Sequence, residues 1–134
     1  MSDPACILLI EDDADLRATT TDILELEGYR VAQAENGLAA LAWLRDPANP
    51  QPMLMLLDLS MPIMNGSQFR AAQRADPSLA TIPVIALTAG RSSVEALAGL
   101  EFEAVLYKPV DIGELLAWLG RYAHRDAITR APSG

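Results

Sequence analysis

Acidic, hydroxyl and ammonium side chains follow four short apolar runs in this sequence. In the order of the runs they are Glu11, Asp12 and Asp13, then Asp58, Thr88 and Lys108. Lys108 is the only lysine among the 10 basic residues, and all the others are arginines. If the runs are neighbouring parallel strands, these polar groups share one edge of a sheet. We therefore expect carboxylates, a hydroxyl group and an ammonium group to meet in one shallow pocket.

Such a set of groups is suited to phosphoryl transfer. Clustered carboxylates without histidine or thiolate suit a hard cation that prefers oxygen ligands, such as Mg²⁺. The carboxylate of an aspartate can act as the nucleophile and form an aspartyl phosphate. A metal ion, a lysine and a hydroxyl group can stabilise the charge on the equatorial phosphoryl oxygens. The sequence therefore contains the groups needed for Mg²⁺-dependent phosphorylation of an aspartate.

Each of these residues also has a purely structural interpretation. An aspartate after a strand is often the N-cap of the next helix, which fits Asp12 or Asp13. Thr88 alone would be interpreted as a turn residue, and Asp58 alone as an ordinary loop aspartate. Chance seldom places complementary polar groups at four of five expected strand ends, which favours the functional interpretation of the whole set.

Several other classes of function lack their residues here. His124 is the only histidine, so neither a Ser/His/Asp triad nor a zinc site of the HExxH type can be assembled. The GxxxxGK[ST] and GxGxxG nucleotide-binding motifs do not occur. Cys6 is the single cysteine, which excludes a disulfide framework and a thiolate metal cluster.

Composition limits the partners and the location. The net charge of -8, a pI near 4.4 and scattered arginines argue against direct binding to nucleic acid. No apolar run approaches the roughly 18 to 20 residues needed to cross a bilayer, and no basic segment precedes an apolar stretch at the start. We expect a single soluble, cytoplasmic domain without membrane contact.

Five segments have the length and composition of strands. Four are continuous apolar runs, typical of parallel strands covered on both faces: residues 6–10, 53–57, 84–87 and 104–107. The fifth segment, residues 30–34 (RVAQA), mixes polar with apolar side chains and is predicted to be an edge strand.

Segments with helical spacing lie after each strand. The predicted helices span residues 13–27, 36–45, 66–75, 91–100 and 111–124. Asn36 and Asp111 are expected to cap the second and the last helix, and Gly28 is expected to end the first. On the first helix, the spacing predicts one buried face made of Leu16, Thr20, Ile23, Leu24 and Glu27.

The alternation of strands and helices predicts an α/β fold of the (βα)5 type. It implies a doubly wound, five-stranded parallel sheet with helices on both faces and right-handed crossovers. In such sheets, ligands bind outside the carboxyl ends of the strands. Residues 1–124 are expected to form this domain, and residues 125–134 a flexible polar tail.

Four stretches together resemble the receiver (CheY-like) domain of two-component response regulators. They are ILLIEDD (7–13), LLDLSMPIMNG (56–66), IALTAG (85–90) and YKPV (107–110), and the resemblance covers residues 5–124. Each stretch is a weak signal alone, but the four in this order and spacing are specific. The resemblance implies a flavodoxin-like sheet with strand order 2-1-3-4-5.

The same resemblance implies roles for individual residues. Asp58 would accept a phosphoryl group from a phosphohistidine on a sensor histidine kinase or a histidine phosphotransfer protein. Thr88 and Lys108 would contact the phosphoryl oxygens. Mg²⁺ would be held by the carboxylates of Glu11, Asp12 and Asp58 and by the backbone carbonyl of Ser60. Asp13 lies one place beyond the family's acidic pair and is interpreted as a helix cap.

The resemblance also assigns structural support and indicates a departure. Pro109 is expected to follow a cis peptide bond, and Pro62 and Gly66 are expected to support a turn. Val105 stands at a switch position that commonly carries an aromatic residue in the family. The usual aromatic half of the switch is therefore missing.

The leading hypothesis is a freestanding receiver that relays a signal to a downstream protein, as a monomer or as a dimer formed on phosphorylation. Such a domain is not an enzyme in the usual sense, because it catalyses only its own phosphorylation and dephosphorylation. A phosphatase similar to the haloacid dehalogenases is one alternative, although those enzymes carry a second aspartate where Ser60 stands. A phosphorylation-independent interaction module is the other, and Val105 is the feature in its favour.

Overall fold

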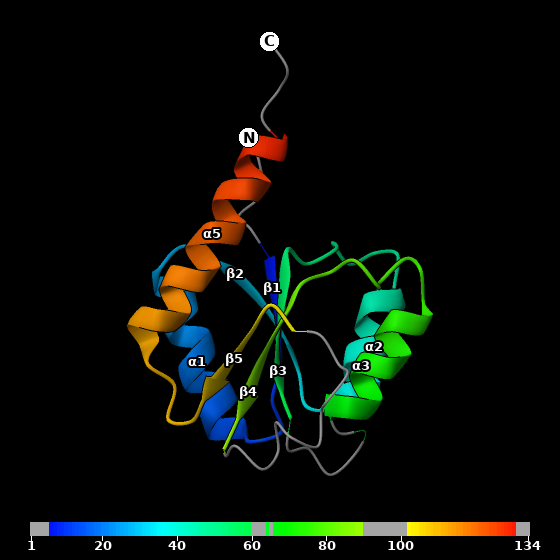
Figure 1. Cartoon of the computed structure of the whole chain (residues 1–134), viewed down its shortest axis with the longest axis horizontal. Helices are drawn as coiled ribbons and strands as arrows, with labels where there is room; N and C mark the ends of the chain where they lie inside the picture. Colours follow the sequence, from blue (N-terminus) through cyan, green and yellow to red (C-terminus); the bar gives the residue numbers. More distant parts are fainter. Residues whose placement is uncertain (1–5, 60–63, 65, 90–101, 131–134) are drawn as a thin grey trace.

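The computed structural model describes residues 6–59, 64, 66–89 and 102–130, which form strands and helices in alternation (Figure 1). The strands are β1 (Cys6–Ile10), β2 (Arg30–Ala34), β3 (Leu54–Asp58), β4 (Val84–Thr88) and β5 (Ala104–Tyr107). The helices are α1 (Ala14–Leu26), α2 (Gly37–Arg45), α3 (Gly66–Ala75) and α5 (Ile112–Arg130). The helix predicted for residues 91–100 lies outside the described residues.

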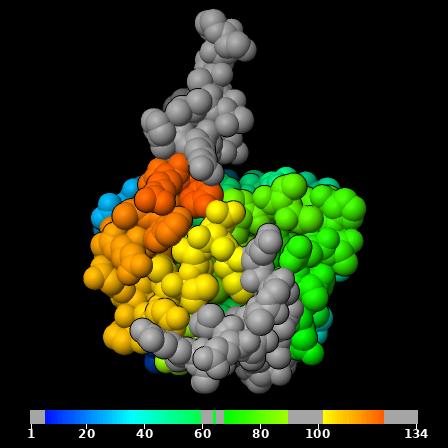
Figure 2. Space-filling model, viewed as in Figure 1, coloured from blue at the N-terminus to red at the C-terminus, as the bar shows by residue number. Residues whose placement is uncertain are grey.

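The strands form one parallel sheet in the order β2-β1-β3-β4-β5, as predicted. Helices α1 and α5 cover one face of the sheet, and α2 and α3 cover the other (Figure 1). The edge strand β5 and the first part of helix α5 lie at the surface in Figure 2, where they are yellow and orange. Because all five strands are parallel, their carboxyl ends share one edge of the sheet, and this edge is where a ligand site is expected.

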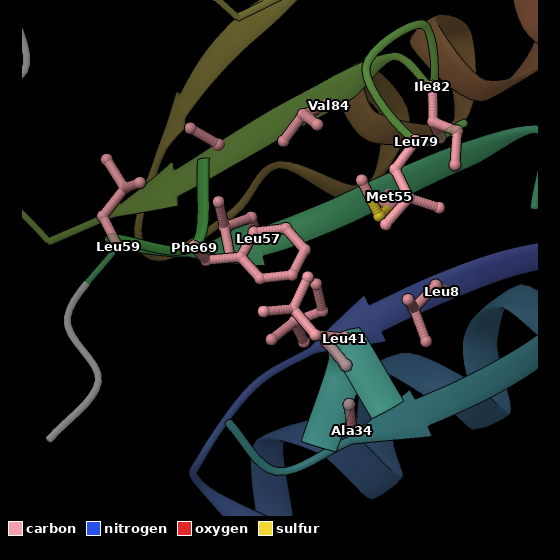
Figure 3. Close-up of a cluster of buried hydrophobic side chains, with 13 residues drawn as sticks. Leu8, Ala34, Leu41, Met55, Leu57, Leu59, Phe69, Leu79, Ile82 and Val84 are labelled. Atoms are coloured by element: carbon pink, nitrogen blue, oxygen red, sulfur yellow. The ribbon is translucent and has the colours of Figure 1, made fainter. Parts of the chain in front are cut away.

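The core lies on both faces of the sheet, because successive strand residues point to opposite sides. Leu8 and Met55 face α2 and α3, in a cluster that also contains Phe69 (Figure 3). Leu9 and Leu56 face α1 and α5, in a second cluster. Every residue of β1 and β3 is buried. Burial on both faces explains why these strands are apolar without interruption.

The helix boundaries follow the predicted capping residues. The Asp13 carboxylate accepts hydrogen bonds from the N–H groups two and three residues later, both at 3.0 Å, and so caps α1. Asn36 and Asp111 accept from the third following N–H group at 2.8 and 3.0 Å. Gly28 follows the end of α1 with a φ of 93°, in the left-handed region that favours glycine. These four predictions are confirmed.

Several boundaries differ from those predicted, most of them by one residue. β3 and β4 each extend one residue further and include Asp58 and Thr88, because the ladder continues: the N–H of Leu59 donates to the carbonyl of Leu87 at 3.0 Å. The last helix continues past residue 124 to Arg130, because a helix can propagate by backbone hydrogen bonding without an apolar face. The domain boundary after residue 124 stays a prediction.

The buried face of α1 is also different from the predicted one. Leu24 is fully buried as expected, but Leu16 is 39% exposed and Glu27 faces solvent. Thr21 is buried instead, and Arg17 donates to a backbone carbonyl at the end of β1. The helix is thus rotated about its axis relative to the prediction, because periodicity indicates a face but not which side of it meets the sheet.

Candidate functional site

Lys108 joins two carboxylates at the carboxyl edge of the sheet. Its Nζ atom lies 3.1 Å from Oε1 of Glu11 and 3.3 Å from Oδ1 of Asp58. Glu11 follows β1, Asp58 is the last residue of β3, and Lys108 follows β5. Three separate strands therefore bring one ammonium group and two carboxylates into direct contact. Lys108 and Glu11 are 97 residues apart in the sequence.

Thr88 lies between these groups in the strand order, at the end of β4. It is fully buried and pairs in register with Tyr107 of β5. Its carbonyl oxygen accepts a hydrogen bond from the N–H of Lys108 at 2.8 Å. This bond holds the residue after β5 beside β4, so the lysine begins its reach toward Glu11 and Asp58 from a defined position.

Three carboxylates form a cluster that could hold a metal ion. One oxygen atom from each of Glu11, Asp12 and Asp58 lies within 4.8 Å of the other two. Glu11 and Asp58 are only 2% exposed, whereas Asp12 faces solvent. All three donors are hard oxygen ligands, which suit Mg²⁺ or Mn²⁺. The exposed side of the cluster, at Asp12, offers an approach for water and for phosphoryl oxygens.

Glu11 is positioned by its backbone as well as by its side chain. Its N–H donates to the carbonyl of Ala34 at 3.0 Å, which extends the pairing of β1 with β2 by one residue. Its own carbonyl accepts from Nη1 of Arg17 at 2.8 Å, and its Oε2 accepts from the N–H of Asp13 at 3.3 Å. Sequence reasoning missed Arg17, for which the signal is a basic residue one turn into the helix after the acidic run.

Burial and proximity shift the protonation of Glu11 and Lys108 in the absence of a cation. Burial, assisted by Asp58, raises the pKa of Glu11 from 4.5 to about 7 against the opposing effect of Lys108. Burial also acts to lower the pKa of Lys108, but the hydrogen bonds and charges of Glu11 and Asp58 outweigh it and raise that pKa. Lys108 thus stays charged near pH 7, where a proton and a metal ion compete for the oxygens of Glu11.

Pro109 and Val105 lie on either side of Lys108 in the sequence, and the structure describes both. The Lys108–Pro109 peptide is cis, as the sequence resemblance suggests. Val105 is half-buried and packs against the cluster that contains Phe69, opposite Ala86 of β4. An aliphatic side chain therefore occupies this position of β5, and its part in any switch stays a prediction.

The turn after β3 is described only in part. Gly66 is the first residue of α3, and Met64 has a φ of 52°. Among the described residues of this turn, the left-handed backbone conformation therefore belongs to a methionine. Ser60 and Pro62 lie outside the described residues, so the metal-binding carbonyl and the supporting proline stay predictions.

A comparison with protein families decides which proteins share this arrangement. The profile of the response regulator receiver domain matches residues 7–119. The chain belongs to this family. It is 37% identical over 123 residues to the transcriptional regulatory protein CpxR homolog of Haemophilus influenzae, which is 90% of this chain and 51% of that protein. It is 38% identical over 113 residues to the DNA-binding response regulator MtrA of Mycobacterium tuberculosis, which is 83% of this chain and 47% of that protein.

This receiver domain therefore spans about half the length of these curated relatives. Among solved structures, it resembles the signal receiver domain of a signal transduction histidine kinase from Syntrophus aciditrophicus, with a TM-score of 0.82, 27% identity, and coverage of 97% of this chain and 96% of that one. It also resembles the Mn²⁺-bound form of response regulator Rcp1, with a TM-score of 0.70, 26% identity, and coverage of 98% of both chains.

The acidic pocket of Glu11, Asp12 and Asp58 is typical of phosphoaccepting response regulators. Receiver domains are signalling modules and not conventional enzymes, so the phosphatase alternative is wrong for this chain. None of the helices in the described part of the chain combines the length and apolar character of a membrane-spanning segment.

Proposed function

We propose that Asp58 accepts a phosphoryl group from a phosphohistidine of a sensor histidine kinase or histidine phosphotransfer protein, in a Mg²⁺-dependent reaction. The domain then relays the signal to a downstream protein, as a monomer or as a dimer formed on phosphorylation. The observation that carries this proposal is the position of Asp58. It is the last residue of the central strand β3, and its Oδ1 atom lies 3.3 Å from Nζ of Lys108. Receiver domains as a family interact with histidine kinases.

In this reaction a carboxylate oxygen of Asp58 forms a bond to phosphorus while the bond from phosphorus to the donor's imidazole nitrogen breaks. Glu11, Asp12 and Asp58, with the predicted carbonyl of Ser60, would hold Mg²⁺, which when bound offsets negative charge on the carboxylates and the phosphoryl oxygens. Lys108 is placed to donate from its ammonium group to a phosphoryl oxygen as that charge builds up. The hydroxyl group of Thr88 would donate to another oxygen.

Two longer relatives are named for transcriptional regulation and for DNA binding. We assign the contacts of this domain to proteins rather than to DNA, because its net charge is -8. The acidic cluster with Lys108 is present as a set, which favours phosphorylation over a phosphorylation-independent module. Position 105 carries an aliphatic valine, so the relay is proposed without an aromatic switch.

Incubation with Mg²⁺ and acetyl phosphate, followed by intact-protein mass spectrometry, tests the proposal. We expect wild type to gain the mass of one phosphoryl group and Asp58→Asn to gain none. Asp22→Asn, which changes an exposed carboxylate on α1, is the matched control and should be phosphorylated like wild type. A chelator should abolish the uptake. Wild-type protein that takes up no phosphoryl group under these conditions would refute the proposal.

A further inference from the structure

Met64, which lies between β3 and α3 in the sequence, has an unusual backbone conformation. Its φ of 52° lies in the left-handed region, which residues with a Cβ atom rarely adopt. The side chain is half-buried and packs against the cluster that contains Phe69. A conformation of this kind persists only where surrounding contacts hold it, so the contacts of Met64 must be specific.

Gly37, the first residue of α2, is one of these contacts. A Cβ atom added at Gly37 would lie 2.7 Å from Cγ and 2.9 Å from Sδ of Met64, closer than real carbon atoms approach. The thioether side chain therefore fills the space beside Gly37, and any other residue there would displace it. Asn36 holds this end of α2 in place, because its side chain caps the first turn at 2.8 Å.

Asp58, Leu59 and Met64 are thus each held by contacts among the described residues. Asp58 pairs with Leu87 of β4, and the N–H of Leu59 donates to the Leu87 carbonyl at 3.0 Å. Leu59 is buried in the same cluster against which Met64 packs (Figure 3). Met64 follows only five positions after Leu59 in the sequence. Leu59 and Met64 are therefore the described points between which the chain passes from β3 to α3.

We propose that Met64, resting on Gly37, is a positioning residue for the phosphorylation of Asp58, an inference that rests on the proposed function. The contact joins the start of α2 to the segment after Asp58 and acts through the backbone, without touching the phosphoryl group or the metal. Loss of the contact removes this restraint on Met64, six positions after Asp58. It thereby reduces the fraction of molecules in which the carboxylate is presented correctly to Mg²⁺ and to the phosphodonor.

Single and double substitutions test this inference. Gly37→Ala displaces Met64, and Met64→Ala removes its side chain. We expect each variant to lower the rate constant of phosphoryl uptake from acetyl phosphate by about three- to tenfold, with a fall in Mg²⁺ affinity in the same direction. The double variant should be no slower than the slower single variant, because both changes break one contact. Mg²⁺ affinity is measured by calorimetry, well below each unfolding midpoint.

Two further variants serve as controls. Met64→Leu keeps the apolar volume, so we expect its rate constant to remain within about twofold of wild type. Gly120→Ala introduces a Cβ atom on α5 that meets nothing within 4 Å, and it should leave the rate constant and the Mg²⁺ affinity unchanged. If Gly37→Ala does not fold, Met64→Ala and Met64→Leu carry the test.

Several outcomes would overturn the inference. One is wild-type phosphorylation by Met64→Ala, and another is a double variant in which the two single effects multiply. A lower unfolding midpoint with unchanged rate constant and Mg²⁺ affinity would assign the contact to stability alone. If wild type takes up no phosphoryl group, the proposed function fails instead, and Mg²⁺ affinity then decides: equal affinities for wild type and Met64→Ala overturn the positioning role.

Discussion

The interior of the sheet and the carboxylates of Glu11 and Asp58 at its carboxyl edge are similarly buried but opposite in chemistry. Leu56, in the interior, is 0% exposed, and Glu11 and Asp58, at the edge, are 2% exposed. Burial of an apolar side chain stabilises the fold by about 25 cal/mol per Å². Burial of a carboxylate disfavours its charge, and it raises the pKa of Glu11 to about 7. A similar degree of burial therefore stabilises the fold in the interior and disfavours the charged form of Glu11 at the edge.

This contrast develops within a single step along a strand, from Leu57 to Asp58 or from Ile10 to Glu11. The paired strands carry the next residue to a buried position even though its charge is unfavourable there. Lys108 offsets the carboxylates in part. We therefore expect substitutions in the interior to change stability, and substitutions at the edge to change protonation, metal binding and phosphorylation.

Truncation in the interior should have the largest effect on stability. We expect Leu56→Ala to lower the free energy of unfolding by about 3 kcal/mol, since it removes a fully buried side chain and leaves a cavity. Leu26→Ala is the matched control, because Leu26 is 87% exposed, and should change stability by less than about 0.5 kcal/mol. Urea unfolding measures both. Similar losses for the two variants would contradict the comparison.

In the absence of a metal ion, the unfavourable burial of Glu11 should make the stability of the protein depend on pH. The folded-state pKa of Glu11 is raised from 4.5 to about 7, so between these pH values the folded state binds more protons than the unfolded state. Stability therefore falls as the pH rises through this window. We expect wild type to lose on the order of 2 kcal/mol more than Glu11→Gln over this range.

Chemical unfolding in the presence of a chelator, repeated at several pH values, measures this difference. Glu25→Gln alters an exposed carboxylate and should follow the wild-type profile. Added Mg²⁺ should restore stability to wild type above pH 7 more than to Glu11→Gln, since the variant lacks one ligand. Parallel profiles for wild type and Glu11→Gln would show that burial at the edge is not unfavourable.

Thr21 is a buried polar residue that faces the apolar interior, where the other buried residues are mainly apolar. Its hydroxyl group is buried and has no hydrogen-bond partner among the residues that the structure describes. We expect Thr21→Val to raise the free energy of unfolding by about 1 kcal/mol, because valine keeps the shape and removes the unsatisfied group. Thr19→Val, at an exposed position of the same helix, should be neutral in thermal unfolding. A destabilised Thr21→Val would contradict the assignment.

Lys108→Arg should have the smallest effect on stability, within about 0.5 kcal/mol, because the positive charge is kept. We expect it to weaken the coupling between phosphorylation and the response, since a planar guanidinium cannot replace a compact ammonium group between Glu11 and Asp58. Amide chemical shifts before and after phosphorylation measure the response. Shift changes on phosphorylation that are as large in Lys108→Arg as in wild type would contradict this expectation.

Much of the fold follows from the apolar runs. β1 and β3 are predictable because an uninterrupted apolar run is needed where a strand is buried on both faces. The ends of β3 and β4 were placed one residue too early. Asp58 and Thr88 are polar, so their side-chain types do not indicate that their backbones still pair with neighbouring strands. The buried side of α1 was misplaced for a related reason, because periodicity does not determine the rotation of a helix.

The site was predictable where its residues lie at strand ends, and not where they act from loops or from another helix. Glu11, Asp58 and Lys108 occupy positions that the parallel order of strands brings together. Arg17 contacts Glu11 from one turn into the next helix, a signal that lies in the sequence but was missed. Met64 reaches Gly37 through tertiary packing, and no spacing in the sequence indicates that contact. The roles of Ser60 and Pro62 stay predictions.

The sequence by itself determined the order of strands and helices, the family, and which kinds of chemical group meet at the sheet edge, because each depends on residue type and local spacing. Only the tertiary structure decided the pairing of Lys108 with both carboxylates, the raised pKa of Glu11, and the contact of Met64 with Gly37. These depend on distances and burial between elements that are far apart in the chain, and such quantities exist only once the elements have packed.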